Sequence, residues 1–178
     1  MVRQGEVLSR IGKMAELFDD HSPLQLQVSG TWQGQAFTLV GRLQYKYDQG
    51  TWTEWHALRA DGSSAFLSED NGAYVFTTEQ TLTREMPAAE RYQVGASVNI
   101  NGRAFGVASN SLVTLIAAQG ELPRLPGLGE RFAMVELRSQ ELDAKGVGQV
   151  LSLDYSTQPP RVSLGESVRL EELKLNGL

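Results

Sequence analysis

Tight-turn dipeptides divide this sequence at short intervals, and their spacing constrains the fold more than any other feature. They lie at Gln33-Gly34, Asp48-Gln49-Gly50, Asp61-Gly62, Asn71-Gly72 and Asn101-Gly102. Asn-Gly and Asp-Gly suit type I′ hairpins, because both central residues of that turn need a positive φ. Runs rich in Val, Thr, Leu and aromatic residues separate these turns. The pattern therefore predicts an all-β chain of antiparallel strands.

The first half of the chain predicts a five-strand meander that starts near Leu26. Its clearest strands are residues 36–47, 51–58, 65–68 and 73–76. Within the longest of them, the odd positions Phe37, Leu39 and Leu43 share one face. Gly41 interrupts that face, which predicts a β-bulge or a sharp bend there.

The second half repeats the pattern of the first. Strands are predicted at residues 98–100, 103–107, 111–118, 131–138, 150–154, 161–164 and 167–170. The turn segment from Gln33 to Phe37 resembles the segment from Asn101 to Phe105, at an offset of 68 residues. We therefore expect a duplicated meander that forms two related half-barrels or a pseudo-twofold sandwich, with both Phe residues in the core. The alternative is two unrelated hairpins that share common turn residues.

Three segments follow from this duplication: a lead-in at residues 1–22, a first β repeat at 23–85 and a second at 86–178, packed as one body. In the lead-in, Val7, Ile11, Met14 and Phe18 recur at spacings of three and four. This spacing favours a short amphipathic helix. An extended lead-in is the alternative.

Composition excludes several classes of function. The chain has no Cys, which removes disulfides, thiol catalysis and thiolate metal sites. His21 and His56 are the two histidines, too few for an imidazole metal cluster. We therefore expect no metal and no cofactor. The formal net charge is −5 and the Lys and Arg residues are scattered singly, so no nucleic-acid surface is predicted.

The distribution of apolar residues predicts a cytoplasmic location without direct membrane insertion. No apolar run approaches the roughly 18 residues that a membrane-spanning helix needs. No long apolar segment follows the N-terminal residues, so no signal peptide is expected.

The densest group of candidate functional residues lies around Trp52, Glu54 and His56, which share one face of a predicted strand. Tyr45 and Tyr47, across the turn at residues 48–50, extend this face. Exposed aromatic residues are typical anchors of protein interfaces, which makes these residues a candidate partner-binding surface. The alternative places one Trp in the core and the other over a barrel rim.

Arg42 completes the candidate surface, because the hairpin register places it near Glu54, with which we expect it to pair. The sequence shows no Ser/His/Asp set, no glycine-rich phosphate loop and no paired carboxylates of the catalytic kind. We therefore expect the protein not to be an enzyme.

Several stretches resemble one bacterial family, catalogued as domain of unknown function four-one-seven-eight. They are residues 11–17, 22–26, 40–45, 50–55 and 66–69, with 153–155, 159–160, 165–166 and 173–175 toward the C-terminus. The pair Gly-Arg-Leu-Gln-Tyr and Trp-x-Glu-Trp is the most specific part. The family has no established activity.

The resemblance implies three further points. Family members often follow a zinc ribbon with paired cysteines, so this chain is either a ribbonless member or a shortened one. Relatives tend to be encoded near membrane-stress proteins and polyamine-synthesis enzymes. We therefore expect a non-catalytic binding or adaptor module for a protein partner, with a membrane-associated complex as one candidate. The alternative is a small-ligand sensor with a pocket between the two repeats, which an enclosed, partly apolar cavity at their junction would favour.

Overall fold

The computed structural model describes residues 22–81, 85–123 and 127–178, and among these the regular elements are ten strands and two 3₁₀ helices. In chain order they are β1 (Ser29–Trp32), β2 (Gln35–Tyr47), β3 (Gly50–Arg59), β4 (Ser64–Asp70), β5 (Ala73–Gln80), η1 (Ala89–Arg91), β6 (Ser97–Ile100), β7 (Arg103–Gly120), β8 (Arg131–Ser139), β9 (Val150–Asp154), β10 (Arg161–Val168) and η2 (Leu170–Leu173). The all-β prediction is confirmed. The predicted N-terminal helix lies outside the described residues.

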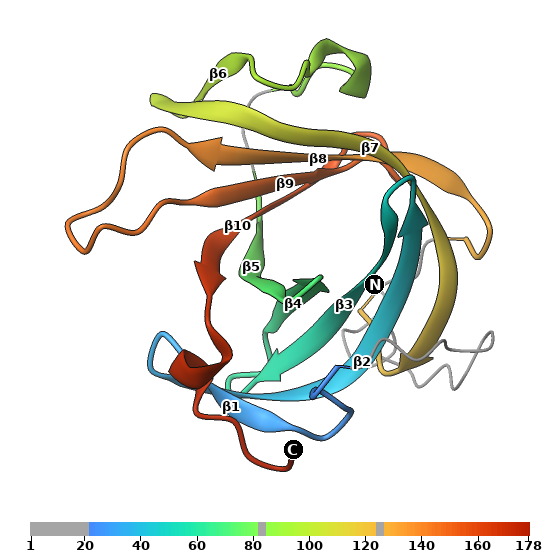
Figure 1. The fold of residues 1–178 in the computed structure, drawn as a ribbon, viewed down its shortest axis with the longest axis vertical. Helices are drawn as coiled ribbons and strands as arrows, with labels where there is room; N and C mark the ends of the chain where they lie inside the picture. Colours follow the sequence, from blue (N-terminus) through green and yellow to red (C-terminus); the bar gives the residue numbers. More distant parts are fainter. Residues whose placement is uncertain (1–21, 82–84, 124–126) are drawn as a thin grey trace.

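Eight of the strands close into an antiparallel barrel. Their order is β2-β3-β4-β5-β10-β9-β8-β7, and β7 pairs again with β2. In Figure 1, β7, β8 and β9 cross the upper part of the view, β2 and β3 run through its lower part, and β10 connects the two levels. The remaining strands, β1 and β6, extend the sheet beyond the ring along the edges of β2 and β7.

Two β-bulges allow β2 and β7 to pair with the other strands of the ring and also with the additional strands β1 and β6. In β2 the register shifts between Leu39 and Gly41, as the glycine predicted. In β7 it shifts between Val107 and Ser109. A bulge bends its strand and increases the local twist. The first part of each strand therefore pairs with β1 or β6, and the last part pairs with the other long strand.

The two runs of five strands have the same order and the same registers. In each run, every strand pairs with the next one along the chain. Matching pairs are Gly30↔Phe37 and Val98↔Phe105, Trp55↔Leu67 and Val135↔Leu153, Leu67↔Phe76 and Leu153↔Val162. The two runs meet at two antiparallel seams, β2–β7 and β5–β10.

Apolar side chains gather on the outer face of each run. One cluster, with Trp32, Phe37 and Trp55, lies on β1–β5 and includes Leu173 of η2. A second, with Phe105 and Leu137, lies on β6–β10 and includes Tyr92 beside η1. Burial of this apolar surface is the main favourable term in folding. Phe37 and Phe105 are 2% and 3% exposed, so both are core residues as predicted.

A third apolar cluster joins the two runs at the β2–β7 seam. Its buried members include Leu43, Tyr45, Leu115 and Phe132. Tyr45 contacts Phe132 edge-on, with ring centroids 6.0 Å apart. This cluster links the first half of the chain to the second half through side chains as well as through the backbone ladder.

Three predicted strand boundaries are wrong. The strands predicted at 103–107 and 111–118 form one strand, β7, and those at 161–164 and 167–170 form β10. Polar residues and glycine interrupt the apolar alternation in both, but the ladders to β8 and β5 continue past them. The first strand starts at Ser29, after Leu26. No helix among the described residues is long and apolar enough to cross a membrane.

Candidate functional site

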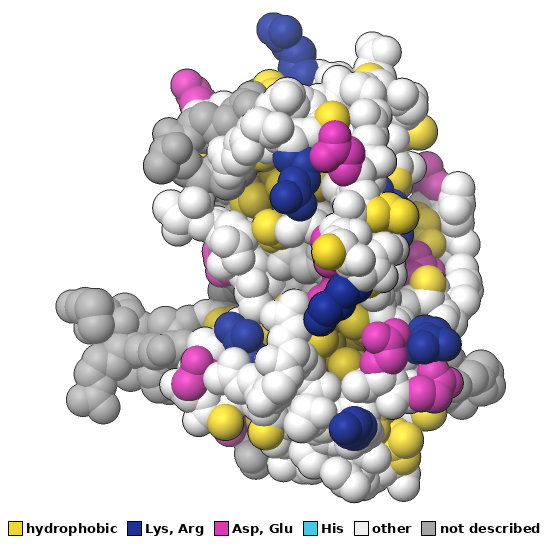
Figure 2. All heavy atoms as spheres, turned by 90° about the vertical axis from the view of Figure 1, so that its left-hand side faces the viewer, with side chains coloured by type: hydrophobic (Ala, Val, Ile, Leu, Met, Phe, Trp, Pro, Cys, Tyr) yellow, Lys and Arg dark blue, Asp and Glu magenta, His cyan; other side chains and the backbone are white. Residues whose placement is uncertain are grey.

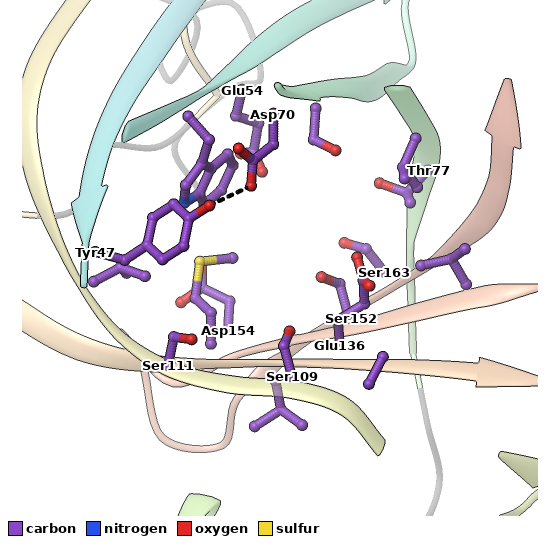
Figure 3. A pocket seen from close by; sticks show the side chains of 18 of the residues that line it. Tyr47, Glu54, Asp70, Thr77, Ser109, Ser111, Glu136, Ser152, Asp154 and Ser163 are labelled. Carbon is purple, nitrogen blue, oxygen red and sulfur yellow. Dashed lines mark hydrogen bonds between the residues drawn. The ribbon is translucent and has the colours of Figure 1, made fainter. Parts of the chain in front are cut away.

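The inner face of the barrel lines a cavity of about 420 Å³, which is open to solvent beside the exposed lining residues Gln49, Ala73 and Arg138. Strands of both halves line it, and their inward side chains point toward a shared space (Figure 3). The cavity forms because the closed sheet has two unlike faces. Along β4 the apolar Ala65 and Leu67 point to the outer cluster, whereas Phe66 and Ser68 point into the cavity. Strand alternation therefore places apolar groups outside and many polar groups inside.

Carboxylates, hydroxyl groups, the carboxamide of Gln49 and one guanidinium make up the polar part of the lining. The charged groups are Glu54, Asp70, Glu136, Asp154 and Arg138. The hydroxyl groups are those of Ser68, Thr77, Ser109, Ser111, Ser152 and Ser163, with the phenol of Tyr47. An array of this kind can donate and accept hydrogen bonds to a small bound molecule.

Tyr47 and Asp70 form a hydrogen bond across one wall of the cavity. The phenol donates to Asp70 Oδ2 at 2.7 Å (Figure 3). Burial of the phenol and the neighbouring Asp70 carboxylate raise the pKa of Tyr47 to about 12. The second oxygen, Asp70 Oδ1, is buried and accepts no hydrogen bond. A buried acceptor without a donor is costly, so this oxygen is a natural contact for a ligand.

On the opposite wall, Asp154 is 7% exposed and one of its oxygens accepts the backbone N–H of Ser156 at 2.8 Å. Arg138 Nε lies 3.2 Å from Glu136 Oε2, and a second guanidinium nitrogen donates to Ser167 Oγ at 3.1 Å. The only guanidinium of the lining is therefore engaged with its own neighbours.

Aromatic and apolar side chains form the rest of the wall. Trp52 stacks on Tyr45 with ring centroids 4.5 Å apart and an interplanar angle of 20°. Phe66, Val113 and Met134 also line the cavity. The cavity is thus partly apolar and partly polar, which is typical of sites for small organic molecules.

His56 is fully buried and closes one end of the inner face. Its Nδ1 lies 2.9 Å from the backbone oxygen of Glu121, and its Nε2 lies 2.8 Å from Ser64 Oγ. A carbonyl oxygen only accepts, so Nδ1 carries a hydrogen. The ring also stacks on Phe66. This imidazole therefore has a structural role between β3, β4 and the segment after β7.

The predicted partner-binding residues do not form an exposed surface. Tyr45 is 1% exposed and His56 is 0% exposed, so the expectation that their face reaches solvent is wrong for these two residues. Trp52, Glu54 and Tyr47 are half-buried and line the cavity. The error has a physical cause: in a closed barrel the second face of a strand meets the other strands instead of solvent. Partner binding by these residues stays a prediction.

Arg42 lies on the other face of the sheet. The register pairs Arg42 with Trp55 and Leu43 with Glu54, so Arg42 and Glu54 point to opposite sides. The Arg42 guanidinium lies 5.1 Å from the centroid of the Trp55 ring and its Nε donates to Gln119 Oε1 at 3.1 Å. The expected pairing of Arg42 with Glu54 is replaced by this arrangement.

Sequence reasoning missed the polar lining of the second half. Ser109, Glu136, Ser152 and Asp154 are separated by up to 45 residues in the chain and match no motif. One signal was available: Glu136, Ser152 and Asp154 occur at inward positions of strands whose neighbouring residues are apolar. A polar residue at every second position of a buried strand indicates a polar interior.

The outer surface carries charged side chains of both signs. On the face that Figure 2 shows, basic and acidic side chains are mixed, and several of opposite charge lie side by side. Among the described residues, no group of three or more His, Asp or Glu side chains is placed to hold a metal ion.

One protein family matches the chain over residues 25–170, described as Domain of unknown function (DUF4178). The chain belongs to this family, as the sequence resemblance indicated. No curated protein and no solved structure matches the chain.

Proposed function

We propose that this member of the DUF4178 family binds one small polar ligand inside its barrel, at the junction of two duplicated five-strand units. The cavity carries the proposal: it has a volume of about 420 Å³, and its lining comes from both halves. Ligand sites of soluble proteins are typically pockets of this size with a few polar groups on a partly apolar wall. The proposal adopts the small-ligand alternative of the sequence analysis and includes no catalysis.

The duplication is supported by the registers rather than by residue identity. Phe37 and Phe105, 68 positions apart, pair with Gly30 and Val98, which are also 68 apart. The bulges in β2 and β7 have the same separation. Both seams between the units are antiparallel, as a pseudo-twofold axis requires. The ligand would then lie between the units, where closed barrels commonly hold small molecules.

Protein-partner binding is less well supported. It was predicted from an aromatic face that is turned into the barrel, with Tyr45 and His56 fully buried. A protein partner has no access to side chains at such positions without opening the sheet. A small molecule needs only a path to the cavity.

Thermal unfolding in the presence of small polar compounds tests the proposal, with one variant that fills the cavity. Ser152→Phe places a ring at a position that faces the cavity, and the matching position of the first half already holds Phe66. Leu112→Phe is the control, because Leu112 is 56% exposed and outside the cavity lining.

A compound present at 100 times its Kd stabilises the folded protein by about 2.7 kcal/mol, which raises the Tm of a chain of this size by about 5–10 °C. We expect this increase for the native protein and for Leu112→Phe, and none for Ser152→Phe. An equal increase in all three proteins would place the ligand elsewhere and contradict the proposal.

A further inference from the structure

Acidic side chains outnumber basic ones in the lining of the cavity. Four carboxylates and one guanidinium line it. The guanidinium of Arg138 is paired with Glu136, and 48% of its side chain is exposed. Carboxylates therefore outnumber basic groups in the lining, and a bound molecule with positive charge would complement them.

Two of the carboxylates have features that favour an N–H donor. Asp70 Oδ1 is buried without a hydrogen-bond partner, although the other oxygen accepts the Tyr47 phenol. Asp154 is more than nine-tenths buried and, like Asp70, lies on the cavity wall (Figure 3). Charged N–H donors make the strongest hydrogen bonds to carboxylates, and burial of the carboxylate strengthens such a bond.

A single metal ion does not fit this arrangement. The carboxylates come from four strands, β3, β4, β8 and β9, around the ring. Among residues 22–81, 85–123 and 127–178, no three acidic or imidazole side chains are placed to hold one ion. The negative charge is spread around the cavity, which suits an extended molecule with charge at more than one point. Trp52 and Phe66 provide apolar surface for the carbon chain of such a molecule.

We propose that the cavity selects a small organic cation, a molecule with ammonium or guanidinium groups on a short carbon skeleton. This inference rests on the proposed function, because it names the chemical class of the ligand for the same cavity. The Asp70 carboxylate, through its unpartnered oxygen, and the Asp154 carboxylate accept the N–H groups of the ligand. The serine hydroxyls of the second half act as further acceptors.

Isothermal titration calorimetry with three matched probes tests the class: 1,6-diaminohexane, 1,6-hexanediol and adipate, which share six carbon atoms and differ in charge. We expect the diamine to bind the native protein at least tenfold more tightly than the diol or the dicarboxylate. Its affinity should fall as ionic strength rises, since salt screens charge attraction. Comparable binding of the diol or of adipate would overturn the inference.

Variants assign the binding to the cavity. Asp70→Asn and Asp154→Asn keep the size of the side chain and remove its charge, so each should weaken diamine binding at least tenfold. Glu141→Gln, at an exposed position outside the cavity, removes one charge as a control and should leave the affinity unchanged. The Tm of each variant verifies that it is folded. Unchanged affinity in both Asn variants would contradict the inference.

The outcomes separate this inference from the proposed function. A neutral or anionic compound that binds the native protein but not Ser152→Phe would support a ligand cavity and refute the cationic class. Binding of Mg²⁺ or Mn²⁺ that excludes the diamine would also refute the organic class. If no probe and no compound of the thermal screen bound the native protein, both proposals would fail.

Discussion

The two halves of the barrel share strand order and register, but they differ in what occupies their inner faces. In the first half, the register pairs Gly41 of β2 with His56 of β3, and His56 with Phe66 of β4, so these three residues form one row across the sheet. The matching row across the second half contains Ser109, Glu136 and Ser152. The first row is closed by two stacked rings, whereas all three residues of the second row line the cavity.

The connections between strands explain this difference. Between β2 and β3 lie two residues, 48 and 49, whereas ten residues, 121–130, lie between β7 and β8. The longer connection starts by crossing the first half, where the backbone of Glu121 donates to Val40 O at 2.7 Å and accepts from His56. The short turn has no counterpart to this crossing. Glu121 and Leu122, at the start of this connection, therefore cover part of the inner face of the first half, and the turn between β2 and β3 gives the second half no such cover.

The largest expected effect tests the equivalence of the two outer cores. Phe37→Ala and Phe105→Ala each remove a buried ring at matched positions of β2 and β7, so each should lower the free energy of unfolding by about 3–5 kcal/mol. Denaturant titration measures both. Similar losses in the free energy of unfolding would support the equivalence of the two outer apolar clusters. A loss below about 1 kcal/mol in either variant would show that the two cores are not equivalent.

The next effect concerns the crossing of the first half. A Cβ atom at Gly41 would lie 2.1 Å from the backbone oxygen of Glu121, so Gly41→Ala must displace the crossing segment. We expect a loss of about 2–3 kcal/mol in the free energy of unfolding. The matched control is Ser109→Ala, which should change it by less than about 0.5 kcal/mol. Equal losses in the two variants would contradict the crossing as the source of the asymmetry.

The smallest expected effect is on the pH dependence of stability, and it comes from Tyr47 in the cavity wall. The pKa of Tyr47 is raised to about 12, so the folded state keeps this phenol protonated between about pH 10 and pH 12 while the unfolded state ionises it. The unfolded state then binds fewer protons, and stability falls as pH rises through this range. Tyr47→Phe should remove this part of the decrease. Phenolate absorbance should also lose one late-titrating tyrosine; a profile identical to that of the native protein would be inconsistent with the Tyr47–Asp70 contact.

The sequence predicted the local geometry well, because turns and bulges depend on a few adjacent residues. Asn71 and Asn101 have a positive φ in the turns that Asn-Gly predicted, and the bulge lies where Gly41 predicted it. The all-β class was predicted from the same turns, whereas the family was predicted from matching stretches such as Gly-Arg-Leu-Gln-Tyr and Trp-x-Glu-Trp.

The candidate site was predicted only in part, because it depends on closure of the sheet. A pocket between the repeats was the alternative expectation, and the predicted residues Tyr47, Trp52 and Glu54 line the cavity. Trp52 and Glu54 were correctly assigned to one strand face, but strand alternation does not tell whether that face meets solvent or the opposite wall. Ser152 and Asp154 become neighbours of first-half residues only through the β5–β10 and β2–β7 seams. Pairings between segments so far apart in the chain have no local signal.

Chemical-shift mapping of the backbone amides during titration with 1,6-diaminohexane tests the central claim most directly, since it locates the ligand without a variant. We expect the largest shifts at inward positions of both halves, including Asp70, Ser152 and Asp154, and none at the exposed Val94 and Leu112. Shifts confined to exposed positions of the outer surface would show that the diamine does not enter the barrel, and would contradict a ligand site between the two halves.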